Sequence, residues 1–205
     1  MHTYSTDSKY RVKIPAVIGV ISYFLVQYID QLRTFFPSYG VLEGWVPSFG
    51  IVISILFVVF NQWIWRASIL RRLGIVKVPD LNGTWTGTGR TIRPDADDEE
   101  EFDVEVMIKQ RWRTISIELE TDDSRSRSLG ATILTGEGMT PTLTYQYLSE
   151  PKPTAPENMH THRGTTTLDY REEDGEIKLV GDYYTGRGRR TFGHLNLVRQ
   201  DSEQE

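Results

Sequence analysis

Two neighbouring stretches, residues 102–110 (FDVEVMIKQ) and residues 114–121 (TISIELET), decide the fold. In the first, Phe102, Val104, Val106 and Ile108 alternate with other residues that include the charged Asp103, Glu105 and Lys109, and the second repeats the pattern. Alternation with a period of two predicts a β-strand that buries one face and leaves the other in water. The two stretches therefore predict an antiparallel pair of half-buried strands.

Six more segments of the same kind lie in the chain, one before this pair and five after it. They begin at Leu81, Ser128, Thr142, Gly164, Glu176 and Thr191, and clusters of turn residues separate them. Short connections between consecutive strands predict an up-and-down order, and eight such strands can close around one small ligand. The sequence therefore predicts an all-β domain over residues 80–200, an eight-stranded, lipocalin-like minimal β-barrel, with a disordered tail at 201–205.

Two apolar runs precede this domain. Sixteen uncharged residues lie between Lys13 and Asp30, and 22 lie between Glu43 and Arg66. A membrane-spanning helix needs about 20 residues, so the first run is marginal and the second is long enough. We expect two transmembrane helices, at about 14–33 and 46–65. A cleaved signal peptide and a pair of buried core helices are the alternatives, but a second run follows the first and the rest of the chain is polar.

Basic residues flank the two apolar runs on their outer sides. They are Lys9, Arg11 and Lys13 before the first run and Arg66, Arg71, Arg72 and Lys77 after the second, whereas the segment between carries only Arg33. Such residues stay in the cytoplasm, which predicts a cytoplasmic N-terminal segment at 1–13, a short periplasmic loop, a basic helical joint at 66–79 and a cytoplasmic barrel. The expected location is the bacterial inner membrane, with both termini cytoplasmic.

Charge and composition exclude several classes of function. The chain carries net charge +5 through Lys77 and −10 after it, and an acidic β domain argues against binding DNA or RNA. There is no cysteine, and therefore no disulfide or thiolate metal site. No nucleophile motif, Rossmann fingerprint or P-loop is present. We expect a binder or sensor without a metal, a cofactor or catalytic residues.

The up-and-down order gathers basic and aromatic side chains at one end of the barrel. The first, third, fifth and seventh turns lie together at the end opposite to the start of the first strand. Arginine suits phosphate oxygens and aromatic rings suit bases, so an anionic aromatic ligand such as a nucleotide is expected there. The candidate phosphate contacts are Arg90, Arg127, Arg163, Arg187 and Arg190, and the candidate base contacts are Tyr145, Tyr147, Tyr183 and Phe192. The alternative is that these arginines are ordinary solvated charges in turns.

The whole arrangement resembles a known family. Two N-terminal apolar helices, a basic joint, LNGTWTGT (81–88) opening the barrel and GDYYTGRGRRTFGHLNL (181–197) closing it are similar to the two-transmembrane, β-barrel effectors of bacterial CBASS antiphage defence. The resemblance implies that a partner CD-NTase makes a cyclic di- or oligonucleotide that binds the barrel. It also implies that the effector then oligomerises and disrupts the inner membrane, causing abortive infection.

A second resemblance concerns one tryptophan. Gly83-x-Trp85 resembles the lipocalin signature, which implies that Trp85 plugs the closed end of the barrel. A membrane-tethered, lipocalin-like carrier of a small apolar ligand and a protein-interaction barrel with a filled core therefore stay open as alternative functions.

Overall fold

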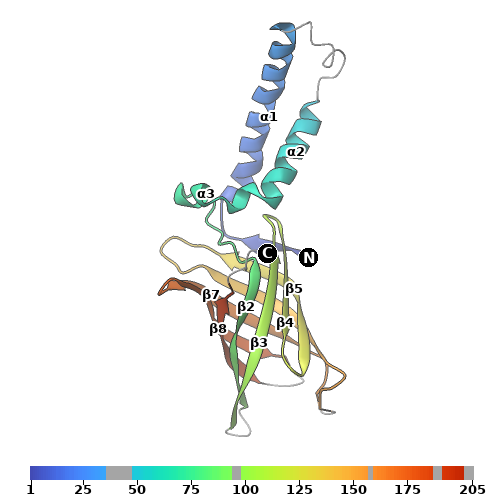
Figure 1. Ribbon diagram of the computed structural model, residues 1–205, viewed down its shortest axis with the longest axis vertical. Coiled ribbons are helices and arrows are strands. Elements are labelled where there is room, and N and C mark those ends of the chain that lie inside the picture. Colours follow the sequence, from blue (N-terminus) through green and yellow to red (C-terminus); the bar gives the residue numbers. More distant parts are fainter. Residues whose placement is uncertain (36–47, 94–97, 157–158, 187–190, 201–205) are drawn as a thin grey trace. The chain divides into compact units, whose positions relative to one another are not determined.

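The computed structural model describes residues 1–35, 48–93, 98–156, 159–186 and 191–200. The chain forms two compact units. One comprises Met1–Ser8 with Lys77–Glu205, and the other comprises Lys9–Val76. The first unit is built of strands and the second of helices (Figure 1).

The helical unit contains α1 (Tyr10–Phe35), α2 (Phe49–Gln62), a 3-10 turn η2 (Ile64–Arg66) and α3 (Ser68–Arg72). The backbone N–H of Ile51 donates to the hydroxyl of Ser48, which caps the start of α2. Gly19 of α1 faces α2, because a Cβ at this position would lie 3.7 Å from Cδ1 of Ile53. The two apolar helices therefore pack against each other.

The lengths of the two helices differ from the sequence-based expectation. α1 has 26 residues, and its Tyr10–Leu32 segment is long and apolar enough to cross a membrane. α2 has 14 residues, or about 21 Å of helix, and among the described residues α1 alone meets the length criterion. The prediction that the first span is the short one is wrong, because the charged residues at the ends of α1 continue the helix. Part of the second predicted span, at 46 and 47, lies outside the described residues.

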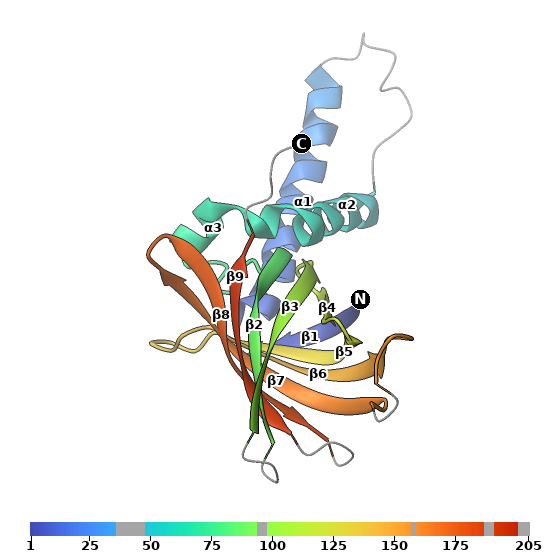
Figure 2. The same cartoon turned by 60° about the horizontal axis from the view of Figure 1, so that its bottom comes forward.

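The barrel unit contains every strand that the sequence predicts, and the all-β prediction is confirmed. In chain order the strands are β2 (Gly83–Arg93), β3 (Asp98–Gln110), β4 (Thr114–Glu120), β5 (Ser124–Leu134), β6 (Thr142–Pro151), β7 (His162–Glu173), β8 (Glu176–Thr185) and β9 (Phe192–Arg199). Each strand is antiparallel to the next, and β2 pairs with β9 from Trp85↔Arg199 to Ile92↔Phe192. These pairings close the sheet into a barrel (Figures 1 and 2).

An additional strand, β1 (His2–Thr6), enters the wall of the barrel. It lies antiparallel to β4 and parallel to β5. The sequence analysis assigned no strand or helix to the N-terminal segment at 1–13, whereas in the structure residues 2–6 are a strand and Tyr10 already begins α1. HTYST is too short for its alternation to stand out in the sequence, and only its tertiary pairing reveals it.

The end of the barrel at which β2 begins is filled with apolar side chains. Trp85 is 0% exposed there, and its indole Nε1 donates to the carbonyl oxygen of Leu81 at 3.0 Å. The guanidinium of Arg199 lies 5.8 Å from the centre of the Trp85 ring. Ile108, Ile115 and Leu197 complete this packing at 2% exposure or less. Trp85 and its neighbours therefore leave little room for a ligand at this end of the barrel.

Candidate functional site

A hollow occupies the end of the barrel opposite to Trp85. It holds about 770 Å³ when the part open to solvent is included. The lining side chains come from β2 to β9. They are Thr91, Glu100, Phe102, Leu119, Thr121, Asp123, Ser124, Ser126, Tyr145, Tyr147, Ser149, Met159, His162, Thr166, Tyr183, Thr185, Thr191 and Leu195. The hollow is thus an aromatic and hydroxyl-rich site open at one end.

Three tyrosines supply the aromatic part of the lining. Tyr145 and Tyr147 follow each other on the inner face of β6, with ring centroids 6.3 Å apart and ring planes inclined by 55°. Tyr183 approaches from β8, and its hydroxyl is 2.5 Å from that of Thr91. Each of the three is at most 9% exposed. All three tyrosines that the sequence predicts as base contacts therefore line one hollow.

The hydroxyl of Tyr145 is the most unusual polar group of the hollow. Tyr145 is 3% exposed, and its hydroxyl has no partner in hydrogen-bonding geometry among the described residues. Burial raises the pKa of Tyr145 to about 12, while the nearby Thr166 hydroxyl acts in the opposite direction. A buried hydroxyl without a partner costs ~1–3 kcal/mol. A ligand that supplied the missing hydrogen bond would recover that cost.

Small hydroxyl side chains surround the tyrosines. Thr91, Ser124, Ser126, Ser149, Thr166 and Thr191 are all buried and all line the hollow. Each hydroxyl can both donate and accept, and can rotate to suit a neighbour. The lining can therefore satisfy the mixed donors and acceptors of a polar, ring-containing ligand.

The charged lining groups that the structure describes are acidic. Glu100 and Asp123 contribute carboxylates, His162 contributes an imidazole, and no Lys or Arg belongs to the described lining. Carboxylates accept hydrogen bonds from amino and imino groups, such as those on base edges, and repel phosphate oxygens. Among the described residues, no group of three or more His, Asp or Glu side chains could hold a metal ion.

Three of the predicted phosphate contacts lie on the outer wall of the barrel. Arg90 is exposed and pairs with Glu99 at 3.2 Å, and Arg127 is exposed and pairs with Glu150 at 3.7 Å. Arg163 is also exposed. None of the three lines the hollow, and the other two candidates, Arg187 and Arg190, lie outside the described residues.

Strand parity explains this placement. Thr91, Ser126 and His162 line the hollow, and each is a direct neighbour in its strand of one of the three arginines. Successive side chains of a strand point to opposite faces, so those arginines must point outward. Phe192 follows Thr191 and is 40% exposed for the same reason. The turn-based prediction considered which end of the barrel each residue occupies but not which face of the sheet its side chain takes.

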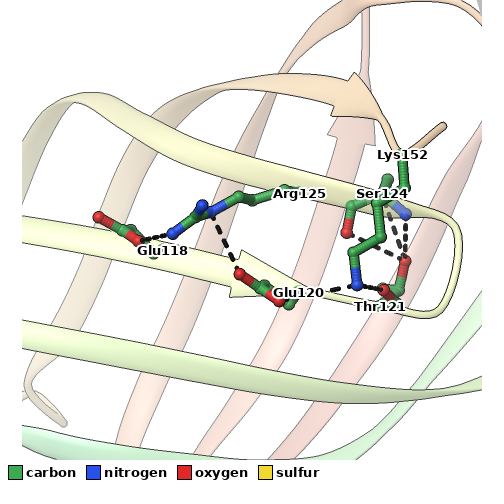
Figure 3. A network of polar contacts seen from close by, with 6 residues as sticks. All are labelled: Glu118, Glu120, Thr121, Ser124, Arg125 and Lys152. Atoms are coloured by element: carbon green, nitrogen blue, oxygen red, sulfur yellow. Dashed lines mark hydrogen bonds and ion pairs between the residues drawn. The ribbon is translucent and has the colours of Figure 1, made fainter.

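A polar network fixes the β4–β5 turn at the mouth of the hollow (Figure 3). The Lys152 ammonium donates to the carbonyl oxygen of Thr121 at 2.7 Å, and the hydroxyls of Thr121 and Ser124 are 3.0 Å apart. On the outer face, Arg125 donates to Glu118 at 2.7 Å and lies 3.1 Å from Glu120. Lys152, which follows β6, and Arg125 of β5 thus hold the β4–β5 turn in place. This turn brings Thr121, Asp123 and Ser124 to the hollow.

Sequence reasoning missed the hydroxyl lining, above all Thr91 and Thr166. Glycines in the middle of strands were the available signal. Gly193 is the register partner of both Thr91 and Tyr183, and Gly164 is the partner of Tyr147. Residues directly opposite each other on neighbouring strands point to the same face, so Gly193 lets Thr91 and Tyr183 share one face with no side chain between them.

A closed barrel with a tyrosine- and hydroxyl-lined hollow defines a receptor for a small ligand. Residues 76–199, more than half of the chain, match the family described as Cap15, cyclic dinucleotide receptor domain. The chain belongs to this family, and the resemblance to CBASS effectors that sense a cyclic nucleotide is confirmed. No curated protein matches the chain. Membership in a receptor family points to a sensor rather than an enzyme.

Proposed function

We propose that the hollow is the cyclic dinucleotide site and that the chain is a CBASS membrane effector. The observation that carries the proposal is the buried, unpartnered hydroxyl of Tyr145 in a hollow whose aromatic rings suit bases. The ligand's bases stack on Tyr145, Tyr147 and Tyr183, and one base edge or ribose hydroxyl completes the hydrogen bonding of Tyr145. The proposed site keeps the three tyrosines expected from the sequence, but its centre lies inside the barrel and not at the rim.

The phosphates of the ligand need a cationic partner that the described lining lacks. Thr185 and Thr191 both line the hollow, and the segment that joins them contains Arg187, Arg189 and Arg190. We assign phosphate binding to Arg187 and Arg190 and withdraw it from Arg90, Arg127 and Arg163. Glu100 and Asp123 then accept from base amino groups, because they would repel the phosphates.

The output of the effector lies in the helical unit. Apolar side chains of α1 and α2 are exposed, among them Val17, Phe24, Ile55 and Val58, as lipid contact requires. We propose a two-pass protein of the bacterial inner membrane with a cytoplasmic N-terminus, C-terminus and barrel. Ligand made by a partner CD-NTase drives self-association, and the clustered helices disrupt the membrane and cause abortive infection. A ligand can drive this change only through a higher affinity for the assembled state.

Calorimetry of the full-length protein in detergent tests ligand binding. Cyclic di-GMP, cyclic di-AMP, cyclic GMP-AMP and cyclic UMP-AMP are titrated separately, and light scattering of the same samples follows assembly. We expect saturable binding of at least one compound together with a larger particle size. Failure of every compound to bind would contradict the ligand assignment, and binding without a change in size would contradict the assembly step.

One observation favours a second function. Because no Lys or Arg belongs to the described lining, an uncharged ligand also suits the hollow, as in a tethered, lipocalin-like carrier. Titration with a fluorescent fatty acid separates the two functions: a carrier binds it and ignores the cyclic dinucleotides. A protein-interaction barrel with a filled core is disfavoured by the hollow itself.

A further inference from the structure

The barrel wall has a slot between β4 and β5. These strands pair directly only near their shared turn, at Glu118↔Arg127, Leu119↔Ser126 and Glu120↔Arg125. Beyond these pairs β1 lies between them: two of its residues pair with β4, and Tyr4, Ser5 and Thr6 pair with Ala131, Thr132 and Ile133 of β5. Figure 2 shows β1 alongside β5. The N-terminal strand therefore fills the slot.

The contacts of β1 with the slot are specific to its side chains. Nε2 of His2 lies 2.8 Å from the hydroxyl of Ser128, and the hydroxyls of Ser5 and Thr132 are 2.6 Å apart. The backbone N–H of Thr135 donates to the carboxylate of Asp7 at 2.8 Å, just beyond the end of β1. The slot thus recognises this particular segment and not an arbitrary extended chain.

The central residue of β1 enters the core. Tyr4 is 5% exposed, and Nε2 of Gln110 donates to its hydroxyl at 3.5 Å. Ile115 and Ile133, on the two sides of the slot, are at most 1% exposed. Removal of β1 would uncover these side chains and leave the backbone groups of two strand edges without partners, which is costly. An empty slot is therefore unfavourable.

The strand in the slot is tied directly to the candidate membrane span. Only Asp7, Ser8 and Lys9 separate β1 from α1. The two compact units of the chain meet within this same linker.

We propose that the slot between β4 and β5 is a strand-acceptor site that takes residues 1–8 of a second copy of this chain when the effector assembles. The exchanged strand makes the same contacts as the original one, so exchange avoids the cost of an empty slot. A free chain prefers its own strand because β1 and the slot belong to one chain, which keeps the strand at high local concentration. Clustering in a membrane removes that advantage. The inference rests on the self-association in the proposed function.

The same two strands face the proposed ligand. Leu119 and Thr121, at the end of β4, and Ser124 and Ser126 of β5 line the hollow, while other parts of these strands form the slot. A ligand that contacts them acts on the strand pair whose separation admits β1. Ligand binding in the hollow could therefore affect strand exchange through β4 and β5 alone.

The absence of cysteine makes the exchange directly measurable. Two differently tagged full-length chains, one with Ser5→Cys and the other with Thr132→Cys, are produced together in membranes and treated with a mild oxidant. Exchange brings the two cysteines into register across chains and shifts the band on a non-reducing gel from one chain to two. A single chain with both substitutions reports occupation of its own slot as a disulfide within the chain.

A matched control pair separates exchange from random collision. Thr144 and Thr167 are neighbours on β6 and β7, with hydroxyls 3.3 Å apart. Thr144→Cys and Thr167→Cys on separate chains should not crosslink, because those strands stay within one barrel. Equal crosslinking of the control pair and of the Ser5–Thr132 pair would overturn the proposal.

Two conditions keep this test independent of the ligand. Crosslinking is followed with each of the four cyclic dinucleotides and, without any of them, at rising chain density in the membrane. We expect two-chain bands with a compound that binds in calorimetry, and at high density even if none binds. Exclusively intrachain disulfides under every condition would refute exchange, and no disulfide even in the double variant would refute the slot itself.

Discussion

The hydroxyl of Tyr183 on β8 reaches the hydroxyl of Thr91 on β2, 2.5 Å away, across the intervening strand β9. The crossing is possible because the β9 residue in register with both is Gly193. A Cβ at position 193 would lie 2.6 Å from Cε1 of Tyr183 and would also meet the carbonyl oxygen of Arg90. The missing side chain therefore sets the position of one wall of the hollow.

Substitution Gly193→Ala should damage both the barrel and the site. The methyl group has no room, and overpacking of this kind costs about 1–3 kcal/mol. We expect thermal unfolding at a temperature lower by several degrees, and weaker binding because Tyr183 must move. Gly130→Ala is the matched control, because a Cβ there meets nothing within 4 Å. An unchanged unfolding temperature for Gly193→Ala would mean that β9 can shift freely.

Substitution Tyr145→Phe should have opposite effects on stability and binding. The change removes a buried hydroxyl without a partner, so the free protein should unfold at an equal or higher temperature. The same change removes the group that the ligand is proposed to satisfy, so the affinity for the cyclic dinucleotide should fall about tenfold, or ~1.4 kcal/mol. Tyr170→Phe, whose hydroxyl donates to Glu172 on an exposed surface, is the control. Unchanged affinity would show that the Tyr145 hydroxyl does not bind the ligand.

The sequence predicted the strands better than it predicted the side chains that line the hollow. Period-two alternation in residues 102–110 and 114–121 locates β3 and β4 directly, because burial of one face requires that pattern. β1 escaped this reasoning since five residues carry little pattern, and its strand character depends on pairing with Ala131–Ile133, far away in the chain.

The predicted site residues divide into those that line the hollow and those that do not. The order of the turns places Tyr145, Tyr147 and Tyr183 together, and the structure agrees. The orientation of Arg90 and Arg127 depends on strand parity, which is fixed only when a neighbour such as Thr91 is known to face inward. Register and small bulges, such as the one between Ser128 and Gly130, set that parity and are not visible in composition.

The arginines divide into two groups that mutagenesis should separate. Arg127→Ala should leave affinity for the cyclic dinucleotide unchanged, because an exposed ion pair such as Arg127–Glu150 contributes about 0–1 kcal/mol and lies outside the hollow. Arg187→Ala and Arg190→Ala should each weaken binding about tenfold or more, since a hydrogen bond to a charged group is worth ~1.5–3 kcal/mol. Calorimetry at two salt concentrations measures both effects. If Arg127→Ala weakened binding more than Arg187→Ala and Arg190→Ala, the phosphates would bind at the outer wall instead.

The anchoring of β1 should depend on pH through Asp7. Desolvation acts to raise the pKa of this carboxyl, but hydrogen bonds outweigh it and lower the pKa, chiefly those from the backbone and hydroxyl of Thr135. A lowered pKa means that the stabilisation is fully present above the unfolded pKa of about 3.9 and disappears as pH falls through the folded value. Docking of β1 should therefore be constant from pH 7 to about pH 5 and weaken below about pH 4.

Hydrogen exchange of the N-terminal peptide, corrected for intrinsic rates at each pH, measures this docking. Asp7→Ala should speed exchange of β1 roughly fivefold at pH 7, or ~1 kcal/mol for an exposed charged hydrogen bond, and abolish the acid-dependent step. Asp122→Ala, which removes an exposed carboxylate from the β4–β5 turn, should change neither. If the acid-dependent step persisted in Asp7→Ala, another group would control the docking of β1, and Thr135 would no longer count as the anchor of the strand.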